Sequence, residues 1–184
     1  MEKINVAVVG YGGMGRYHAN HIEEFEKFNL VGIYDIKQSA CDVATEKGVY
    51  VYPSFEAVLE DERVELIVCA TYNDCHKDIA IRAMKAGKAV ISEKPVTMCS
   101  EDLEEMIKAS EETGKLFTVH QNRRWDNDYR MVKRVLDTNE LGNVFSIDSR
   151  VYGSRGIPGD WRREKQHGGG MLLDWGVHLL DQIL

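Results

Sequence analysis

The chain has 184 residues, which is enough for one domain or for one domain and part of another. Its hydrophobic content of 43% and charged content of 29% are typical of a soluble globular protein. A net charge of -7 argues against nucleic-acid binding, which needs a basic surface, and the sequence lacks the long apolar run that a membrane span requires. Because a strand pattern begins almost at once, we expect no secretory signal.

The cysteines are Cys41, Cys69, Cys75 and Cys99, and they form no CxxC pair and no metal-ligand spacing. We therefore expect reduced thiols and a cytoplasmic protein. The composition as a whole predicts no metal, no membrane partner and no nucleic-acid partner.

The first element is an apolar, strand-like run over Ile4–Val9, followed directly by a GxGxxG pattern at 10–15. A helix-like run comes next, and this strand–turn–helix context is what a dinucleotide-binding turn requires. Gly10 permits the tight turn, Gly12 lets the backbone approach a pyrophosphate, and Gly15 lets the helix pack closely on the strand. The alternative is a glycine-rich turn that binds nothing.

The helix-like run has an apolar stripe formed by Met14, His18, Ile22 and Phe25. A second strand-like run, Leu30–Asp35, ends on a carboxylate. A carboxylate at this position accepts both ribose hydroxyls of an adenosine and repels a 2′-phosphate, which favours NAD over NADP. Lys37 attracts a phosphate, so NADP stays possible. The alternative role of Asp35 is that of a strand-end turn residue.

Strand and helix patterns continue to alternate as far as Asn122. The further predicted strands are Val49–Tyr52, Val64–Ala70, Ala89–Glu93 and Leu116–Asn122. One helix is predicted from Gln38 to Lys47, ending at Gly48, and three more have the N-cap candidates Ser54, Asp74 and Ser100. This alternation predicts βαβ units, and so an α/β fold with a doubly wound, parallel Rossmann sheet.

After Asn122 the pattern changes. We predict a helix over Asp128–Asp137, an alternating strand over Val144–Tyr152, a loop over 153–168 and a helix from near Met171. One clear strand is too few for an ordinary sheet. The sequence therefore predicts a dinucleotide-binding domain over 1–122 and the incomplete start of an α+β domain over 123–184. The alternative is an intact short chain whose sheet is closed by a partner.

Polar residues follow two of the predicted strands. In open α/β sheets, ligands bind beyond the carboxyl ends of the strands, so Thr71 and Asn73 are placed to hydrogen-bond a cofactor. Asp74 and His76 have the simpler alternatives of a helix cap and a first-turn residue.

The next strand ends in Glu93-Lys94-Pro95. The residue before a proline is conformationally restricted, which would aim the Lys94 side chain. A partly buried lysine has a lowered pKa and can exchange protons. The alternative is a solvated lysine.

The last polar cluster follows the glycine run at 168–170. Asp174 and His178 are four residues apart, which predicts one helical face, and Asp181 continues it. A histidine titrates near neutral pH and is suited to moving a proton, while a neighbouring aspartate can fix its tautomer. The alternative is a helix with ordinary polar residues.

These pieces, in this order, resemble the Gfo/Idh/MocA family of NAD(P)-dependent oxidoreductases over nearly all 184 residues. The matching pieces lie at 8–15, 71–76, 86–88, 93–95 and 169–178. The family commonly has proline where Tyr72 stands and often where Asn127 stands. Family members also have a full second domain, whereas this chain ends within the helix that carries His178.

The resemblance implies that Lys94 is the catalytic lysine, that His178 is the acid/base residue and that Asp174 is its partner. Pro95 resembles the family's often cis proline. The residues expected to contact substrate are Lys94, Arg123, Tyr152, Trp161, Arg162, Asp174 and His178. The residues expected to bind the cofactor are Gly10, Gly12, Gly13, Met14, Gly15, Asp35, Ile36, Thr71, Asn73, His76, Glu93, Lys94 and Pro95.

The resemblance implies hydride transfer between NAD, with NADP possible, and a secondary alcohol of a sugar, cyclitol or related polyol. It also implies a homo-oligomer formed through the second domain. One rival function is an NAD-binding sensor or regulatory module without turnover, which would not need Lys94, Asp174 and His178. A second rival is a glycoside-processing enzyme that uses NAD transiently.

Overall fold

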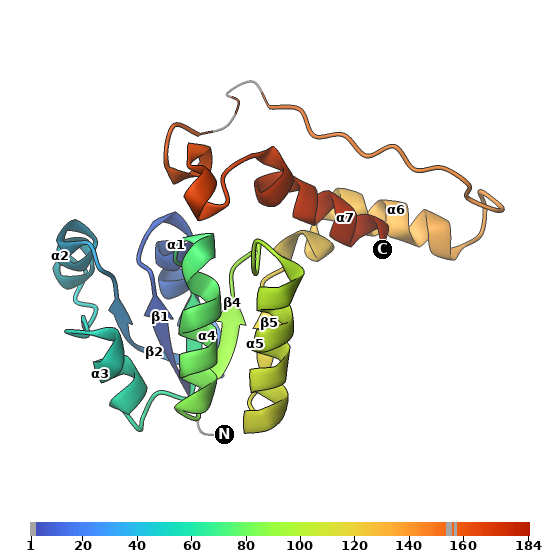
Figure 1. The fold of residues 1–184 in the computed structure, drawn as a ribbon. Helices are drawn as coiled ribbons and strands as arrows, with labels where there is room; N and C mark the ends of the chain where they lie inside the picture. The colour runs from blue at the N-terminus through green and yellow to red at the C-terminus, as the bar shows by residue number, and fades with distance from the viewer. Residues whose placement is uncertain (1–2, 154–155, 157) are drawn as a thin grey trace. The chain divides into compact units, whose positions relative to one another are not determined.

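The computed structural model describes residues 3–153, 156 and 158–184 (Figure 1). The chain divides into two compact units, Met1–Val119 and His120–Leu184. The predicted boundary between residues 122 and 123 remains a prediction.

The first unit is built on a five-stranded parallel sheet with the order β2-β1-β3-β4-β5. The strands are β1 (Ile4–Val9), β2 (Phe28–Tyr34), β3 (Leu66–Cys69), β4 (Ala89–Ser92) and β5 (Phe117–Val119). The helices are α1 (Gly13–Ile22), α2 (Gln38–Glu46), α3 (Phe55–Glu60), α4 (His76–Lys85) and α5 (Ser100–Thr113), with a 3₁₀ turn, η1 (Asn73–Cys75), before α4. The predicted α/β, Rossmann-type sheet is confirmed.

Both faces of this sheet are buried, as the doubly wound arrangement requires. Val6 and Val8 of β1 belong to one apolar cluster, which includes residues of α1 and α2. Ala7 and Val9 belong to a second cluster, which includes residues of α3, α4 and α5. Figure 1 shows α4 and α5 side by side on that second face. Alternate residues of one strand therefore supply two cores.

The predicted strand Val49–Tyr52 is wrong, because only one isolated bridge, Ile33 to Val51, joins this segment to the sheet. The Ile33 amide donates to the Tyr50 carbonyl and the Tyr52 amide donates to the Ile33 carbonyl, both at 2.8 Å. The Tyr52 hydroxyl donates to the Asp61 carboxylate at 2.7 Å. The segment thus leaves the sheet edge after one pair.

The predicted stripe of the first helix is confirmed at Ile22, while Met14 and His18 are half-buried. The buried residues of α1 are Gly15, Ala19 and Ile22, while Phe25 lies beyond the helix and is 58% exposed. The reason is the close contact of the helix with β1 at Gly15, which turns a face of small residues toward the sheet. A pattern of large apolar residues does not reveal such a face.

The predicted N-cap Ser54 is confirmed, because its side chain accepts a hydrogen bond from the Ala57 amide at 3.1 Å. Asp74 is not a cap, since it lies inside η1 and Cys75 precedes the first residue of α4. A 3₁₀ turn here takes the place of the expected cap.

Ser100 is not a cap either. Cys99 has extended backbone angles and is the N-cap residue, so Ser100 is already helical. The Ser100 hydroxyl donates to the Glu101 carboxylate at 3.4 Å instead.

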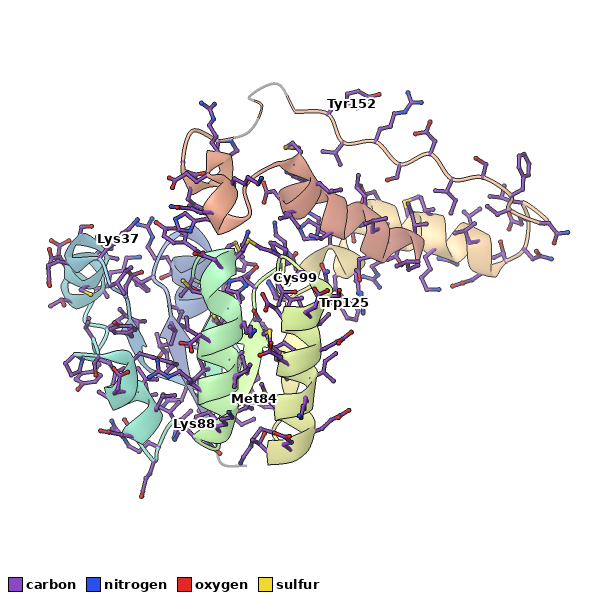
Figure 2. All side chains as sticks on the ribbon, viewed as in Figure 1. Lys37, Met84, Lys88, Cys99, Trp125 and Tyr152 are labelled. Atoms are coloured by element: carbon purple, nitrogen blue, oxygen red, sulfur yellow. The ribbon has the colours of Figure 1, made fainter. Side chains whose placement is uncertain are left out.

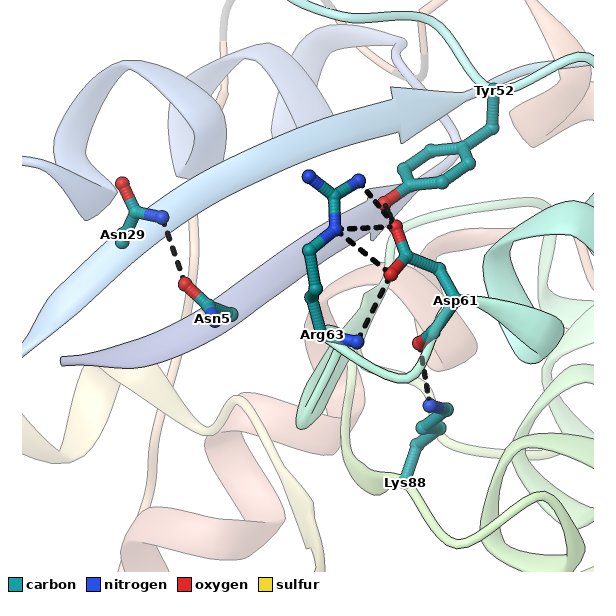
Figure 3. Close-up of polar contacts among 6 residues, drawn as sticks. All are labelled: Asn5, Asn29, Tyr52, Asp61, Arg63 and Lys88. Atoms are coloured by element: carbon teal, nitrogen blue, oxygen red, sulfur yellow. Dashed lines mark hydrogen bonds and ion pairs between the residues drawn. The ribbon is translucent and has the colours of Figure 1, made fainter. Parts of the chain in front are cut away.

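A polar cluster lies at the amino edge of the sheet, just before β3 and β4 (Figure 3). The Asp61 carboxylate accepts hydrogen bonds from the Tyr52 hydroxyl and from the Arg63 guanidinium, the latter at 2.6 Å. Lys88 donates to the Asp61 carbonyl at 2.7 Å. The hydrogen bonds from Arg63 and Tyr52 lower the pKa of the Asp61 carboxyl, and burial raises the pKa of Tyr52. The cluster therefore fixes the segments that precede β3 and β4.

The second unit contains α6 (Asn127–Asp137) and α7 (Val177–Ile183). Its 3₁₀ turns are η2 (Asn122–Trp125), η3 (Trp161–Arg163) and η4 (Lys165–His167), and a π-helical turn, η5 (Leu172–Gly176), precedes α7. The two turns η3 and η4 interrupt the predicted loop, of which residues 154, 155 and 157 lie outside the described residues. Across the described ranges, no helix is long and apolar enough to span a bilayer.

The predicted strand Val144–Tyr152 is not formed. The segment runs extended, and Phe145 is fully exposed. A strand needs a hydrogen-bonding neighbour, and the described part of this unit holds no other strand. The alternating sequence pattern is present, but the described residues contain no neighbouring strand with which the segment could pair.

Candidate active site

The glycine-rich turn links β1 to α1, and its glycines do different things. Gly10 has a φ of +90°, and a Cβ atom there would lie 2.5 Å from the Ala70 carbonyl oxygen. A Cβ atom on Gly15 would lie 1.8 Å from the Gly10 carbonyl oxygen. These two glycines are therefore required by the packing of the turn.

Gly12 and Gly13 face open space, because a Cβ atom on either would meet no heavy atom within 4 Å. No described side chain caps α1 at its N-cap residue, Gly12. Helix N-termini attract anions through their amide groups and the helix dipole. Met14 follows on the first turn and is half-buried. The turn therefore fits a pyrophosphate.

Asp35 lies just beyond the end of β2 and is held by two backbone amides. Its Oδ2 accepts from the Tyr11 amide at 2.6 Å, and its Oδ1 accepts from the Lys37 amide at 2.8 Å. A carboxylate has about four lone-pair sites, so two amide donors leave capacity for ribose hydroxyls. Ile36, which is 78% exposed, offers an apolar surface for an adenine ring at the same place.

His76 is fully buried and connects two loops at the carboxyl edge of the sheet. Its Nδ1 lies 3.0 Å from the Pro95 carbonyl oxygen, and its Nε2 lies 3.3 Å from the Thr71 carbonyl oxygen. Burial lowers the pKa of this ring. The buried ring holds the two loops together, and the expected cofactor contact of His76 stays a prediction. Asn73, beside it, is 5% exposed.

Lys94 follows β4 and is half-buried. The Lys94–Pro95 peptide bond is cis, as the resemblance implied. Glu93 is 6% exposed, and its Oε1 lies 2.7 Å from His18 Nε2. The Lys94 amide donates to the other Glu93 oxygen at 3.3 Å. A buried carboxylate therefore anchors the backbone from which the lysine extends.

The parallel sheet brings these residues to one edge. Gly10 follows β1, Asp35 follows β2, Thr71 lies just after β3, and Lys94 follows β4. The strand order places β1 between β2 and β3, so the chain crosses in opposite directions on the two sides of β1. Ligands bind beyond the strands at such a switch point.

In the second unit, Arg162 contacts two carboxylates. Its guanidinium lies 2.9 Å from Asp160 and 3.5 Å from Asp174. The Gly170 amide donates to the Arg162 carbonyl at 2.9 Å, and a Cβ atom on Gly169 would lie 2.4 Å from that carbonyl oxygen. The glycine run thus allows the segment before η5 to pack against η3. It brings Arg162 and Asp174 together.

His178 is the first-turn histidine of α7 and is 4% exposed. Its ring lies edge-on to Trp175 at a centroid distance of 6.0 Å, and Arg123 lies over the Trp175 ring at 4.2 Å. Asp174 lies within the π-helical turn η5 and His178 lies in α7, so the two site residues do not share one regular α-helix. Asp181 pairs with Arg124 at 2.6 Å instead of extending their face.

The remaining expected substrate residues are only partly gathered. Trp161 is half-buried and lies under Arg162 at 4.6 Å. Tyr152 is 82% exposed on the extended segment, away from this cluster (Figure 2). A cavity of about 460 Å³ lies in the second unit, lined by Arg162, Arg163, Lys165, Gly169 and Gly170. Its three cationic side chains favour a polar ligand.

Two residues of the site were missed by the sequence analysis. His18 was assigned to an apolar stripe but faces the buried Glu93. A histidine inside an otherwise apolar stripe is a signal for such a partner. Tyr72 was treated only as a departure from the family, yet its hydroxyl accepts a hydrogen bond from Lys37. The sequence carries no signal for that contact, which joins residues on different strand-end loops.

Comparison with known proteins gives matches over most of the chain. Residues 4–121 match the oxidoreductase family with an NAD-binding Rossmann fold, and residues 129–184 match the Gfo/Idh/MocA C-terminal domain. A crystal structure of an NAD-binding protein from Listeria innocua is 49% identical, with a TM-score of 0.96, over 100% of this chain and 53% of that chain.

Two curated relatives each match over 100% of this chain. An uncharacterized oxidoreductase of Schizosaccharomyces pombe is 34% identical, and the scyllo-inositol 2-dehydrogenase (NADP(+)) of Bacillus subtilis is 28% identical. The match covers 52% of each relative, so the chain spans about half their length. With an NAD-binding Rossmann unit matched over most of its length, this chain belongs to the Gfo/Idh/MocA family of oxidoreductases.

Proposed function

We propose that the protein transfers a hydride between NAD(P) and a secondary alcohol of a sugar, cyclitol or related polyol. The observation that carries this proposal is the position of Lys94. It follows β4 at the same sheet edge as the glycine-rich turn, on a backbone anchored by the buried Glu93. The curated name of the Bacillus subtilis relative, an inositol dehydrogenase, supports the substrate class.

The first unit holds the cofactor. Its open turn at Gly12 receives the pyrophosphate and Asp35 receives the ribose hydroxyls, as the geometry described above allows. When bound, NAD supplies the hydride acceptor for alcohol oxidation. The Lys94 ammonium lies next to the reacting alcohol oxygen in this proposal, where it stabilises the negative charge that develops.

The second unit binds the substrate and moves its proton. We assign the acid/base role to His178, because an imidazole can both accept and donate a proton. Asp174 orients the substrate hydroxyls together with Arg162, which it contacts at 3.5 Å. Arg123 and Trp161 border the substrate. Tyr152, which is 82% exposed, stays a predicted substrate residue.

The test uses the protein and its Lys94→Ala variant with a panel of inositols and sugars. Formation of NADH is followed by absorbance. We expect turnover with at least one polyol and a loss of about 100-fold or more in kcat in the variant. NAD binding by both proteins, measured by thermal shift, separates a loss of the cofactor from a loss of the chemical step. Equal turnover by the variant would contradict the catalytic assignment, and NAD binding without turnover on any polyol would favour a sensor.

We also propose a cytoplasmic homo-oligomer. The four cysteines are free thiols, which is typical of a reducing compartment. The exposed apolar residues of α6 include Met131 at 70% and Val132 at 57%, and they favour contact with a further protein surface. Light scattering of the protein tests the assembly, and a monomer at all concentrations would contradict it.

A further inference from the structure

A lysine and a tyrosine meet across the mouth of the cofactor site. The Lys37 ammonium donates to the Tyr72 hydroxyl at 2.6 Å. Lys37 follows β2 and Tyr72 follows β3, and these strands flank β1 in the sheet. The contact therefore spans the carboxyl end of β1, where the glycine-rich turn begins. Figure 2 labels Lys37 at the start of α2.

The backbone of Lys37 is hydrogen-bonded to Asp35, the residue proposed to bind the ribose hydroxyls. The Lys37 amide donates to Asp35 Oδ1 at 2.8 Å, which holds the base of the lysine beside that carboxylate. Asp35 accepts hydroxyls and repels a 2′-phosphate, whereas an ammonium attracts a phosphate. A lysine has a flexible stem, and this side chain is exposed, so its ammonium can move between partners.

We propose that Tyr72 is a specificity-determining residue that sets the relative affinity for NAD and NADP through Lys37. In one position Lys37 donates to the Tyr72 hydroxyl, and the ribose is read by Asp35 alone. In the other, Lys37 leaves Tyr72 and pairs with the 2′-phosphate of NADP. Binding NADP therefore costs the contact with Tyr72, while binding NAD does not. This inference rests on the cofactor site of the proposed function.

The experiment measures Kd for NAD and NADP by calorimetry on the protein and its variants. Tyr72→Phe keeps the ring and removes the acceptor, so we expect NADP to bind about threefold to tenfold more tightly. Lys37→Met removes the charge, and we expect about tenfold weaker NADP binding. NAD affinity is expected to stay within about twofold in both variants. Lys47→Met, an exposed lysine at the far end of α2, is the charge-matched control.

The double variant decides the coupling. In a Lys37→Met background, Tyr72→Phe should leave NADP affinity unchanged, because the lysine it releases is absent. A gain in NADP affinity that persists without Lys37 would overturn the inference. The inference would also be overturned if the protein bound NAD and Lys37→Met left the Kd for NADP unchanged. If the wild-type protein bound neither cofactor, the proposed function would fail, and this inference would fail with it.

Discussion

Both units carry periodic apolar patterns, and they bury them to very different extents. In the first unit Val8, Ile67 and Val90 are fully buried. In the second unit Met131 is 70% exposed and Phe145 is fully exposed. A periodic pattern tells which face of an element is apolar, and it does not tell what covers that face.

The difference follows from connectivity. Each of the strands β1 to β4 is followed by a segment that returns over the sheet, so sequence neighbours supply both the next strand and the covering helix. In the second unit the segment Val144–Tyr152 has no strand beside it within the described residues. Local connections therefore complete the first core, whereas the apolar faces of the second unit depend on surfaces that its described residues do not supply.

The largest effect is expected at Gly15. A Cβ atom there would lie 1.8 Å from the Gly10 carbonyl oxygen, and backbone cannot give way as a flexible side chain does. We expect Gly15→Ala to lower the free energy of unfolding by about 5 kcal/mol. Circular dichroism of thermal unfolding measures this. A melting temperature near that of wild type would mean that α1 does not need its close contact with β1.

Gly12→Ala is the matched control, because its Cβ atom would face open space. We expect this variant to melt as wild type does and to bind NAD about tenfold more weakly, since the methyl group occupies the space of the pyrophosphate. Calorimetric titration with NAD measures the affinity. An unchanged Kd would place the pyrophosphate elsewhere.

The same substitution made in both units compares them directly. Met84 is fully buried (Figure 2), so Met84→Ala should cost about 2–5 kcal/mol of unfolding free energy. Met131 is 70% exposed, so Met131→Ala should change it by no more than about 0.5 kcal/mol. Urea unfolding of both variants gives the two values. A large cost at Met131 would reveal that a partner covers α6 in solution.

A smaller effect is expected from pH. Burial lowers the pKa of His76 in the folded chain below its value in the unfolded chain, which is about 6.5. Below that pH, the His76 ring is protonated to a larger extent in the unfolded chain than in the folded chain. Stability is therefore complete above that pH and falls as the pH decreases toward the folded-state pKa. The slope contributed by His76 is at most about 1.4 kcal/mol per pH unit.

Urea unfolding between neutral and mildly acidic pH tests this for wild type and His76→Asn. The variant should lose that part of the slope. His21→Asn, which changes a half-buried histidine of α1, should keep it. Identical slopes for wild type and His76→Asn would show that His76 does not titrate as a buried neutral ring.

The smallest effect is expected at Tyr11. Its side chain is 1% exposed, and its hydroxyl has no hydrogen-bond partner among the described residues. Removing a buried hydroxyl that lacks a partner costs little, so Tyr11→Phe should be neutral or stabilise the protein by up to about 1 kcal/mol. Chemical denaturation measures the change. Destabilisation by more than that would point to a buried water on this hydroxyl.

Much of the site was predictable because its signals are local. The glycine turn lies between a strand and a helix, Asp35 ends the next strand, and Lys94 precedes a proline at a strand end. Parallel strands bring their carboxyl ends to one edge, so the edge followed from the order of elements alone. The family resemblance, confirmed over 4–121, added roles that local pattern does not contain.

The errors have a common cause. Val49–Tyr52 has strand-like residues but makes one bridge, and Val144–Tyr152 alternates but has no neighbouring strand in the described residues. Both patterns indicate a capacity to pair, and pairing needs a second segment. The face of α1 was predicted only in part, since contact at Gly15 decided which residues turned inward.

By itself, the sequence determined the parallel α/β class, the glycine turn and the positions of Asp35 and Lys94. These depend on residue spacing, which acts over one turn or one strand. Only the tertiary structure decided that His18 meets Glu93, that His76 connects two loops and that Lys37 reaches Tyr72. His18 and Glu93 lie 75 residues apart, Lys37 and Tyr72 lie 35 apart, and His76 and Pro95 lie 19 apart. Packing of the whole sheet with its helices brings each pair within hydrogen-bond distance.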